Sequence, residues 1–191
     1  MDDSRVTSQR WTGQKRGKEL LQHAEPPVVY PEALFEEALA PVIQACAQLR
    51  SGTVVRRFGL DFAVFAGEPS RTNVLFIEVK SYGGQRVGSV GFGNGKGGGP
   101  QVDILLCGSG QLPTLDGHIR WAIADATQAV GTARYALLSC SEACGAVMGS
   151  VARGKQNNFR LSAVKPHLVA WAEFCERLIR FMDNGQPTGR S

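Results

Sequence analysis

Apolar residues with helical spacing mark the first structured part of the chain. A helix is predicted over residues 31–49, because five apolar residues there are separated by three or four positions. Pro31 suits the first turn of this helix, whereas Pro41 lies inside it and is expected to kink or shorten it. The residues of the predicted buried face are Phe35, Leu39, Val42, Cys46 and Leu49.

Runs of apolar and alternating residues predict strands in the middle of the chain. Residues 53–65 and 73–80 form two such runs, and the turn-forming stretch at 67–70 predicts that they pair as a hairpin. Two later runs, residues 118–124 and 134–140, predict strands rich in buried residues.

A glycine-rich segment separates these two pairs of strands. Residues 83–99 contain nine glycines among seventeen residues, which predicts a long loop. Two readings of this loop stay open, a flexible insertion and a segment that places backbone amides against DNA. After it, residues 101–107 fit a short helix and a buried strand equally well.

The last element predicted is a second amphipathic helix. It is expected to begin near Pro166 and to stop at Asn184-Gly185, with one apolar face formed by Leu168, Trp171, Cys175, Leu178 and Met182. The predicted order of helices and strands is that of a mixed α/β domain. We expect one domain over residues 28–185, a basic flexible arm at 1–27 with a short helix near Leu20, and a disordered tail at 186–191.

Three charged residues stand beside the two predicted hairpin strands. Side chains alternate along a strand, so Asp61 is expected to point away from the face shared by Leu60, Phe62 and Val64. By the same alternation Glu78 and Lys80 share one face of the second strand, opposite Ile77 and Val79. The three charges therefore gather beside two buried strands.

The hairpin register brings the two acids together. A turn centred between Pro69 and Ser70 gives paired residues whose numbers sum to 139, so Asp61 faces Glu78 with Cβ atoms about 5 Å apart. Two facing carboxylates repel each other unless a cation lies between them. Hard oxygen ligands with room for water suit Mg²⁺ better than zinc, and Lys80 is placed to orient a water molecule or stabilise developing charge.

Asp61 followed after a turn by Glu78-Val79-Lys80 resembles the active-site motif of the PD-(D/E)xK nuclease superfamily. The resemblance implies a mixed central sheet flanked by helices, with a restriction-endonuclease-like core. It implies Mg²⁺, with Mn²⁺ as a substitute, held by Asp61, Glu78 and the carbonyl of Val79, and a Lys80 that assists the attacking water. Leu60 stands where the proline of the motif's name would be.

The same resemblance implies candidates for two further positions of the site. Many members carry a glutamate on the helix before the first strand, and Glu36 lies at the margin of the predicted buried face, with Glu32 as second choice. Some branches use a glutamine after the lysine strand, for which Gln101 is the candidate.

Positive charge is distributed in a way that favours nucleic acid. The net charge is +4, and 15 of the 21 basic residues are arginine, which matches phosphate and guanine edges. Residues 151–165 are basic and contain no acid. The candidate DNA contacts are Arg56, Arg57, Arg86, Asn94, Lys96, Gln101, Arg153, Lys155, Asn157 and Arg160.

Other features of the sequence exclude several classes of protein. The chain of 191 residues has no apolar run long enough for a membrane span and no apolar stretch near its start like that of a secretory signal. Five scattered cysteines indicate free thiols rather than disulfides or zinc. We therefore expect a cytoplasmic protein with no membrane partner.

The sequence as a whole favours a Mg²⁺-dependent endonuclease acting on double-stranded DNA. A small chain of this kind looks most like a type II restriction endonuclease, which implies a homodimer and products with a 5′-phosphate. Three alternatives remain open: a repair, junction or phage-defence nuclease of the same fold, a non-catalytic DNA-binding protein, and an unrelated α/β domain with a surface ion-pair cluster.

Overall fold

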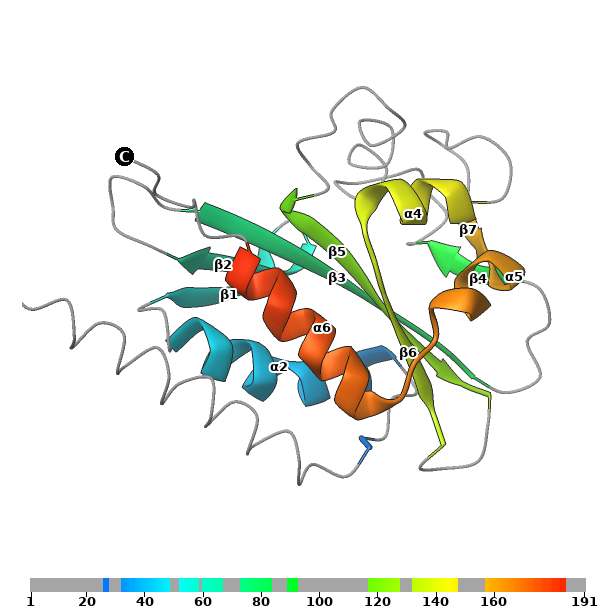
Figure 1. The fold of residues 1–191 in the computed structure, drawn as a ribbon, viewed down its shortest axis with the longest axis horizontal. Helices are drawn as coiled ribbons and strands as arrows, with labels where there is room; N and C mark the ends of the chain where they lie inside the picture. Colours follow the sequence, from blue (N-terminus) through cyan, green and yellow to red (C-terminus); the bar gives the residue numbers. More distant parts are fainter. Residues whose placement is uncertain are drawn as a thin grey trace, which may run out of the picture.

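A five-stranded mixed sheet runs through the centre of the computed structural model (Figure 1). The structure describes residues 26–27, 32–48, 52–58, 60–66, 73–83, 89–92, 117–127, 132–147 and 157–184. In space the strands follow the order β1 (Thr53–Phe58), β2 (Leu60–Ala66), β3 (Asn73–Gly83), β5 (Ile119–Ala126) and β6 (Arg134–Leu138). The pair β3–β5 is parallel and the other neighbours are antiparallel. The mixed α/β architecture with a mixed central sheet is confirmed.

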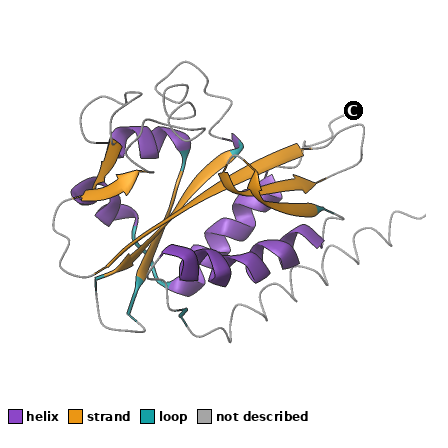
Figure 2. Cartoon of the chain, turned by 180° about the vertical axis from the view of Figure 1, so that it is seen from behind, coloured by secondary structure: helices purple, strands orange, loops and turns teal. Residues whose placement is uncertain are grey.

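Helices cover both faces of this sheet. Helices α2 (Glu32–Gln48) and α6 (Trp171–Asn184) lie side by side on one face, seen from both sides in Figures 1 and 2. The shorter helices α4 (Cys140–Ala146) and α5 (Leu161–Val164) pack on the other face, together with a two-stranded antiparallel sheet of β4 (Ser89–Phe92) and β7 (Asn157–Arg160). The sheet therefore separates two apolar cores.

Helix α2 forms where the apolar spacing predicts it. Phe35, Leu39 and Cys46 are buried as expected, but Ile43 rather than Val42 is the fully buried residue of the third turn. Pro41 lies inside the helix and does not end it. The apolar face is buried on both sides of Pro41, and this packing outweighs the local cost of proline.

The hairpin of the prediction consists of three strands rather than two. The single strand expected over residues 53–65 is wrong, because the chain reverses between Phe58 and Leu60 and β1 pairs with β2. The register between β2 and β3 is confirmed: Phe62 lies opposite Ile77 and Val64 opposite Leu75, so paired numbers sum to 139.

Three other boundaries differ from the prediction. The expected loop at 83–99 contains strand β4. The expected strand at 134–140 ends at Leu138, because Ser139 and Glu142 form a capping box that starts α4. The last helix begins at Trp171 rather than near Pro166, because residues 165–167 form a 3₁₀ turn, η3 (Lys165–His167), and Val169 is hydrogen-bonded in an extended segment to Tyr135.

Several predictions fall on segments outside the described residues. These are the arm at 1–25 with its helix near Leu20, most of the glycine-rich segment, the undecided element at 101–107 and the tail at 186–191. Within the described part of the chain, no helix has both the length and the apolar character needed to cross a membrane.

Candidate active site

Strand β3 extends beyond the point where β2 stops covering it. The pairs between β2 and β3 end at Phe62 and Ile77, so the predicted pair of Asp61 with Glu78 is not part of the ladder, whereas β3 continues to Gly83. Leu60 itself belongs to the core beneath α4 and α5, not to the core that contains Phe62 and Val64. The expectation that these three residues share one face is therefore wrong, because β2 turns away from β3 at its first residues.

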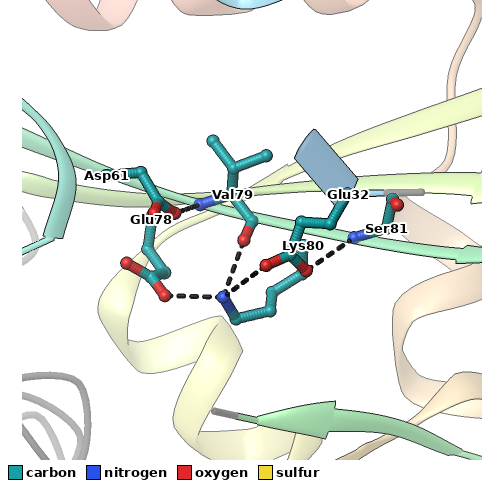
Figure 3. Close-up of polar contacts among 6 residues, drawn as sticks. All are labelled: Glu32, Asp61, Glu78, Val79, Lys80 and Ser81. Carbon is teal, nitrogen blue, oxygen red and sulfur yellow. Dashed lines mark hydrogen bonds and ion pairs between the residues drawn. The ribbon is translucent and has the colours of Figure 1, made fainter. Parts of the chain in front are cut away.

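The carboxylate of Asp61 takes the place of a strand carbonyl at this divergence. The amide of Val79 donates to Oδ2 of Asp61 across 2.6 Å, as Figure 3 shows. A partly buried backbone N–H needs an acceptor, and the side chain supplies it where the ladder between β2 and β3 ends. This hydrogen bond fixes the orientation of Asp61 beside the Glu78–Lys80 segment.

Glu78 and Lys80 form a buried ion pair on one face of β3. Their side chains are 1% and 7% exposed, and Nζ of Lys80 lies 2.6 Å from Oε1 of Glu78. The same ammonium donates to the carbonyl of Val79 across 2.7 Å. Two ions are rarely buried this deeply unless each has a charged partner. The pair is therefore held in one arrangement by its own hydrogen bonds.

Glu32 reaches this pair from the start of α2. Its Oε1 lies 3.3 Å from Nζ of Lys80, and its Oε2 accepts the amide of Ser81 across 3.2 Å (Figure 3). The amide of Ser81 belongs to the part of β3 that β2 no longer covers. An acid in the first turn also interacts favourably with the helix dipole. The second-choice glutamate of the sequence prediction is thus the one that contacts Lys80.

The charges around Lys80 keep it protonated. Burial alone lowers the pKa of Lys80, but the nearby carboxylates of Glu78, Glu32 and Asp61 outweigh burial and raise the pKa above the usual value of 10.5. The side chain is therefore an ammonium ion at neutral pH, enclosed by oxygen atoms.

The acceptor atoms at this position are all oxygens. One carboxylate oxygen of Glu78 and the carbonyl of Val79 converge on the ammonium, and Asp61 is anchored on the next amide. All are hard oxygen donors, which Mg²⁺ prefers. The described residues hold no group of three or more His, Cys, Asp or Glu side chains placed to share one ion. Asp61, Glu78 and the carbonyl of Val79 are the groups here that could hold a metal ion together with water.

Glu36 lies at the margin of the buried face of α2, as predicted, and is paired with Arg56. Its carboxylate lies 3.5 Å from the guanidinium of Arg56, which also donates to Glu37 across 2.7 Å. The hydrogen bond to Glu37 raises the pKa of Arg56 in spite of a small opposing effect of burial, and the charges of both glutamates and of Asp61 add to the rise. The structure therefore places Arg56 against α2, near the edge of the site.

The other predicted DNA contacts are placed only in part. Arg160 is exposed at the end of β7. The backbones of Arg57 and Asn157 lie in β1 and β7, but their side chains are outside the described residues. Also outside them are Arg86, Asn94, Lys96, Gln101, Arg153 and Lys155.

One buried charge was not singled out from the sequence. Asp125 on β5 is 7% exposed, and its Oδ1 accepts both the amide and the hydroxyl of Thr127, at 2.9 and 2.6 Å. Burial and the charge of Asp125 raise the pKa of Tyr82, which lies opposite it in the β3–β5 register. The short Asp-x-Thr spacing was the available signal, since it is typical of a side chain that closes a turn.

Comparison with known proteins identifies no relative of this chain. No protein-family model matches the chain, and a search of curated proteins finds no match. The geometry of Asp61, Glu78, Lys80 and Glu32 is therefore the basis on which we infer function.

Proposed function

We propose that this protein is a Mg²⁺-dependent endonuclease that hydrolyses phosphodiester bonds in double-stranded DNA, with a restriction-endonuclease-like core. One observation supports this above the others: Asp61, Glu78 and Lys80 meet where β2 leaves β3. There a carboxylate is anchored on Val79 and an ammonium is held on Glu78. Two carboxylates beside a lysine, one on β2 and one with the lysine on the middle strand β3, match what metal-assisted phosphodiester cleavage needs.

Each residue of the site has a separate role in the proposed reaction. Asp61, Glu78 and the carbonyl of Val79 would hold the metal, which when bound supplies Lewis acidity toward a phosphate oxygen and acidifies a water ligand. The ammonium of Lys80 donates a hydrogen bond to the attacking water or to the phosphate oxygen on which charge develops. The water forms the new P–O bond and releases a proton to solvent, while the P–O3′ bond breaks and the 3′-oxygen takes up a proton from solvent, which leaves a 5′-phosphate and a 3′-hydroxyl.

A type II restriction endonuclease is the specific role we propose. It would act as a homodimer on a short duplex site, in the cytoplasm. Arg160 is an exposed cation on β7, suited to a phosphate contact. Repair, junction or phage-defence nucleases share the same chemistry and are distinguished by their products.

Cleavage of supercoiled plasmid DNA with Mg²⁺ tests this proposal. Lys80→Ala is expected to lower the single-turnover rate by about 100- to 10,000-fold, because a positioned hydrogen-bond donor is lost. Arg177→Ala is the matched control, since Arg177 is an exposed cation in an ion pair with Glu173 on α6. Metal-dependent cleavage that survives Lys80→Ala would remove Lys80 from the mechanism.

The products separate the possible roles. Discrete fragments from linear duplex DNA support a restriction enzyme, whereas cleavage confined to branched or damaged DNA supports a repair or junction nuclease. Binding that falls steeply with salt and is not followed by metal-dependent cleavage would identify a non-catalytic DNA-binding protein and overturn the proposal.

A further inference from the structure

The ammonium of Lys80 has three oxygen partners, and two of them are proposed metal ligands. It donates to Glu78, to the Val79 carbonyl and to Glu32, which accounts for all three of its N–H bonds. The ammonium therefore contacts two oxygen atoms that a metal at this site could use, Oε1 of Glu78 and the carbonyl of Val79.

Lys80 cannot keep all three contacts when those oxygens hold a divalent cation. A cation bound to both Glu78 and the Val79 carbonyl would lie close to the ammonium that contacts the same two groups, and the two positive charges would repel each other. The cation would compete with the ammonium of Lys80 for Glu78 and for the carbonyl of Val79. It would not compete for the contact with Glu32.

The contacts of Glu32 allow it to keep its position when Lys80 moves. One of its oxygens is fixed by the amide of Ser81, and the other, at 3.3 Å, is the longest of the three contacts of Lys80. The side chain of Glu32 is 43% exposed, whereas that of Glu78 is 1% exposed, so Glu32 has room for the ammonium to approach.

We propose that Glu32 is the positioning residue of Lys80: it receives the ammonium when a divalent cation binds at Glu78 and the Val79 carbonyl, and keeps it beside the reacting water. The inference rests on the proposed metal site and adds a role for a glutamate outside the proposed ligand set. Without Glu32 the displaced lysine would turn toward solvent, away from the reaction.

The side-chain ammonium signal of Lys80 in ¹⁵N-lysine NMR spectra tests this directly. Lys80 is one of six lysines, and Lys80→Met identifies its signal. With saturating Ca²⁺ as the probe, the wild-type signal is expected to shift and to remain slow in exchange with water. In Glu32→Gln the same addition is expected to speed the exchange at least tenfold, because the displaced ammonium has lost its charged acceptor.

Two further variants complete the test. Glu173→Gln removes an exposed glutamate that pairs with an arginine on α6, and it is expected to behave as the wild type. Glu32→Asp keeps the charge and is expected to restore slow exchange in part. Glu32→Ala, which also removes the charged acceptor, replaces Glu32→Gln if the latter fails to fold. The inference is overturned if Ca²⁺ leaves the Lys80 signal unchanged, or if the signal stays slow in Glu32→Gln with Ca²⁺.

The outcome is separable from that of the nuclease proposal. If the Lys80 signal responds as expected but the protein cuts no DNA with Mg²⁺, the role of Glu32 as positioning residue is supported and the nuclease proposal is overturned. If the protein cuts DNA but Ca²⁺ leaves the Lys80 signal unchanged, the nuclease proposal is supported and the proposed role of Glu32 is overturned.

Discussion

On one face of β3, Ile77 and Val79 pack among apolar side chains beneath α2 and α6; on the other, Glu78 and Lys80 are buried almost as deeply beside Trp121 and Ile123. Burying apolar groups stabilises a fold directly, whereas burying an ion pair recovers at best the cost of removing two ions from water. Deep burial of a side chain therefore does not by itself identify a residue of the apolar core. Stability alone gives little reason to bury such a pair, whereas the proposed function requires it.

The largest effect expected from this comparison is on the charged face. Lys80→Met should lower the free energy of unfolding by about 4 kcal/mol at neutral pH without divalent ions, because Glu78 loses the ammonium that compensates its buried charge. Urea unfolding measures the change. The double variant Glu78→Leu with Lys80→Met should recover most of the loss. A single variant within 1 kcal/mol of the wild type would mean that the pair is far better solvated than its burial indicates.

The apolar face gives the next largest effect. Ile77→Ala should lower the free energy of unfolding by about 3 kcal/mol, because it leaves a cavity in the core beneath α2 and α6. Urea unfolding again measures it, while cleavage per folded molecule should stay within a few-fold of the wild type. A large loss of cleavage in fully folded protein would show that the two faces are not independent.

The smallest effect concerns alkaline pH. Burial raises the pKa of Tyr135, on the α2–α6 side, to about 12 from 10. The unfolded chain therefore loses this proton before the folded protein does, so this contribution to stability is complete below pH 10 and disappears as pH rises toward 12. Tyr135→Phe should make the fall in stability between pH 10 and 12 shallower.

Urea midpoints measured from pH 7 to pH 12 check this expectation, and the variant should lie close to the wild type at pH 7. Part of the alkaline loss should remain in Tyr135→Phe, because the pKa of Cys175 is raised by burial to about 12 and that of Lys80 is raised as well. Identical slopes for the two proteins would show that Tyr135 is not the group responsible.

The sequence predicted the parts of the fold that depend on local pattern. The spacing of Phe35, Leu39 and Cys46 located α2, and turn residues near Pro69 gave the β2–β3 register. It failed where a tertiary or capping contact decides the outcome. Ser139 and Glu142 start a helix within an apolar run, and the pairing of Val169 with Tyr135 keeps the chain extended ahead of α6.

The candidate site was predictable to a similar extent. Alternation along β3 placed Glu78 and Lys80 on one face, as the structure has them. The choice between Glu36 and Glu32 depended on where the start of α2 meets the part of β3 beyond its pairing with β2, and no periodicity within the helix contains that information. Arg56 sits against Glu36 and Glu37 for the same reason, since β1 brings it back to the helix.

The divergence of β2 from β3 has a further consequence, for self-association. Two amides on the side of β3 that β2 leaves are capped by acids, Val79 by Asp61 and Ser81 by Glu32. An uncovered strand edge with unpaired amides is a template on which another chain can add a strand. Here each of these two donors is already bonded to a carboxylate whose charge repels an incoming backbone carbonyl. The two acids are therefore expected to disfavour the addition of a strand at this edge of β3.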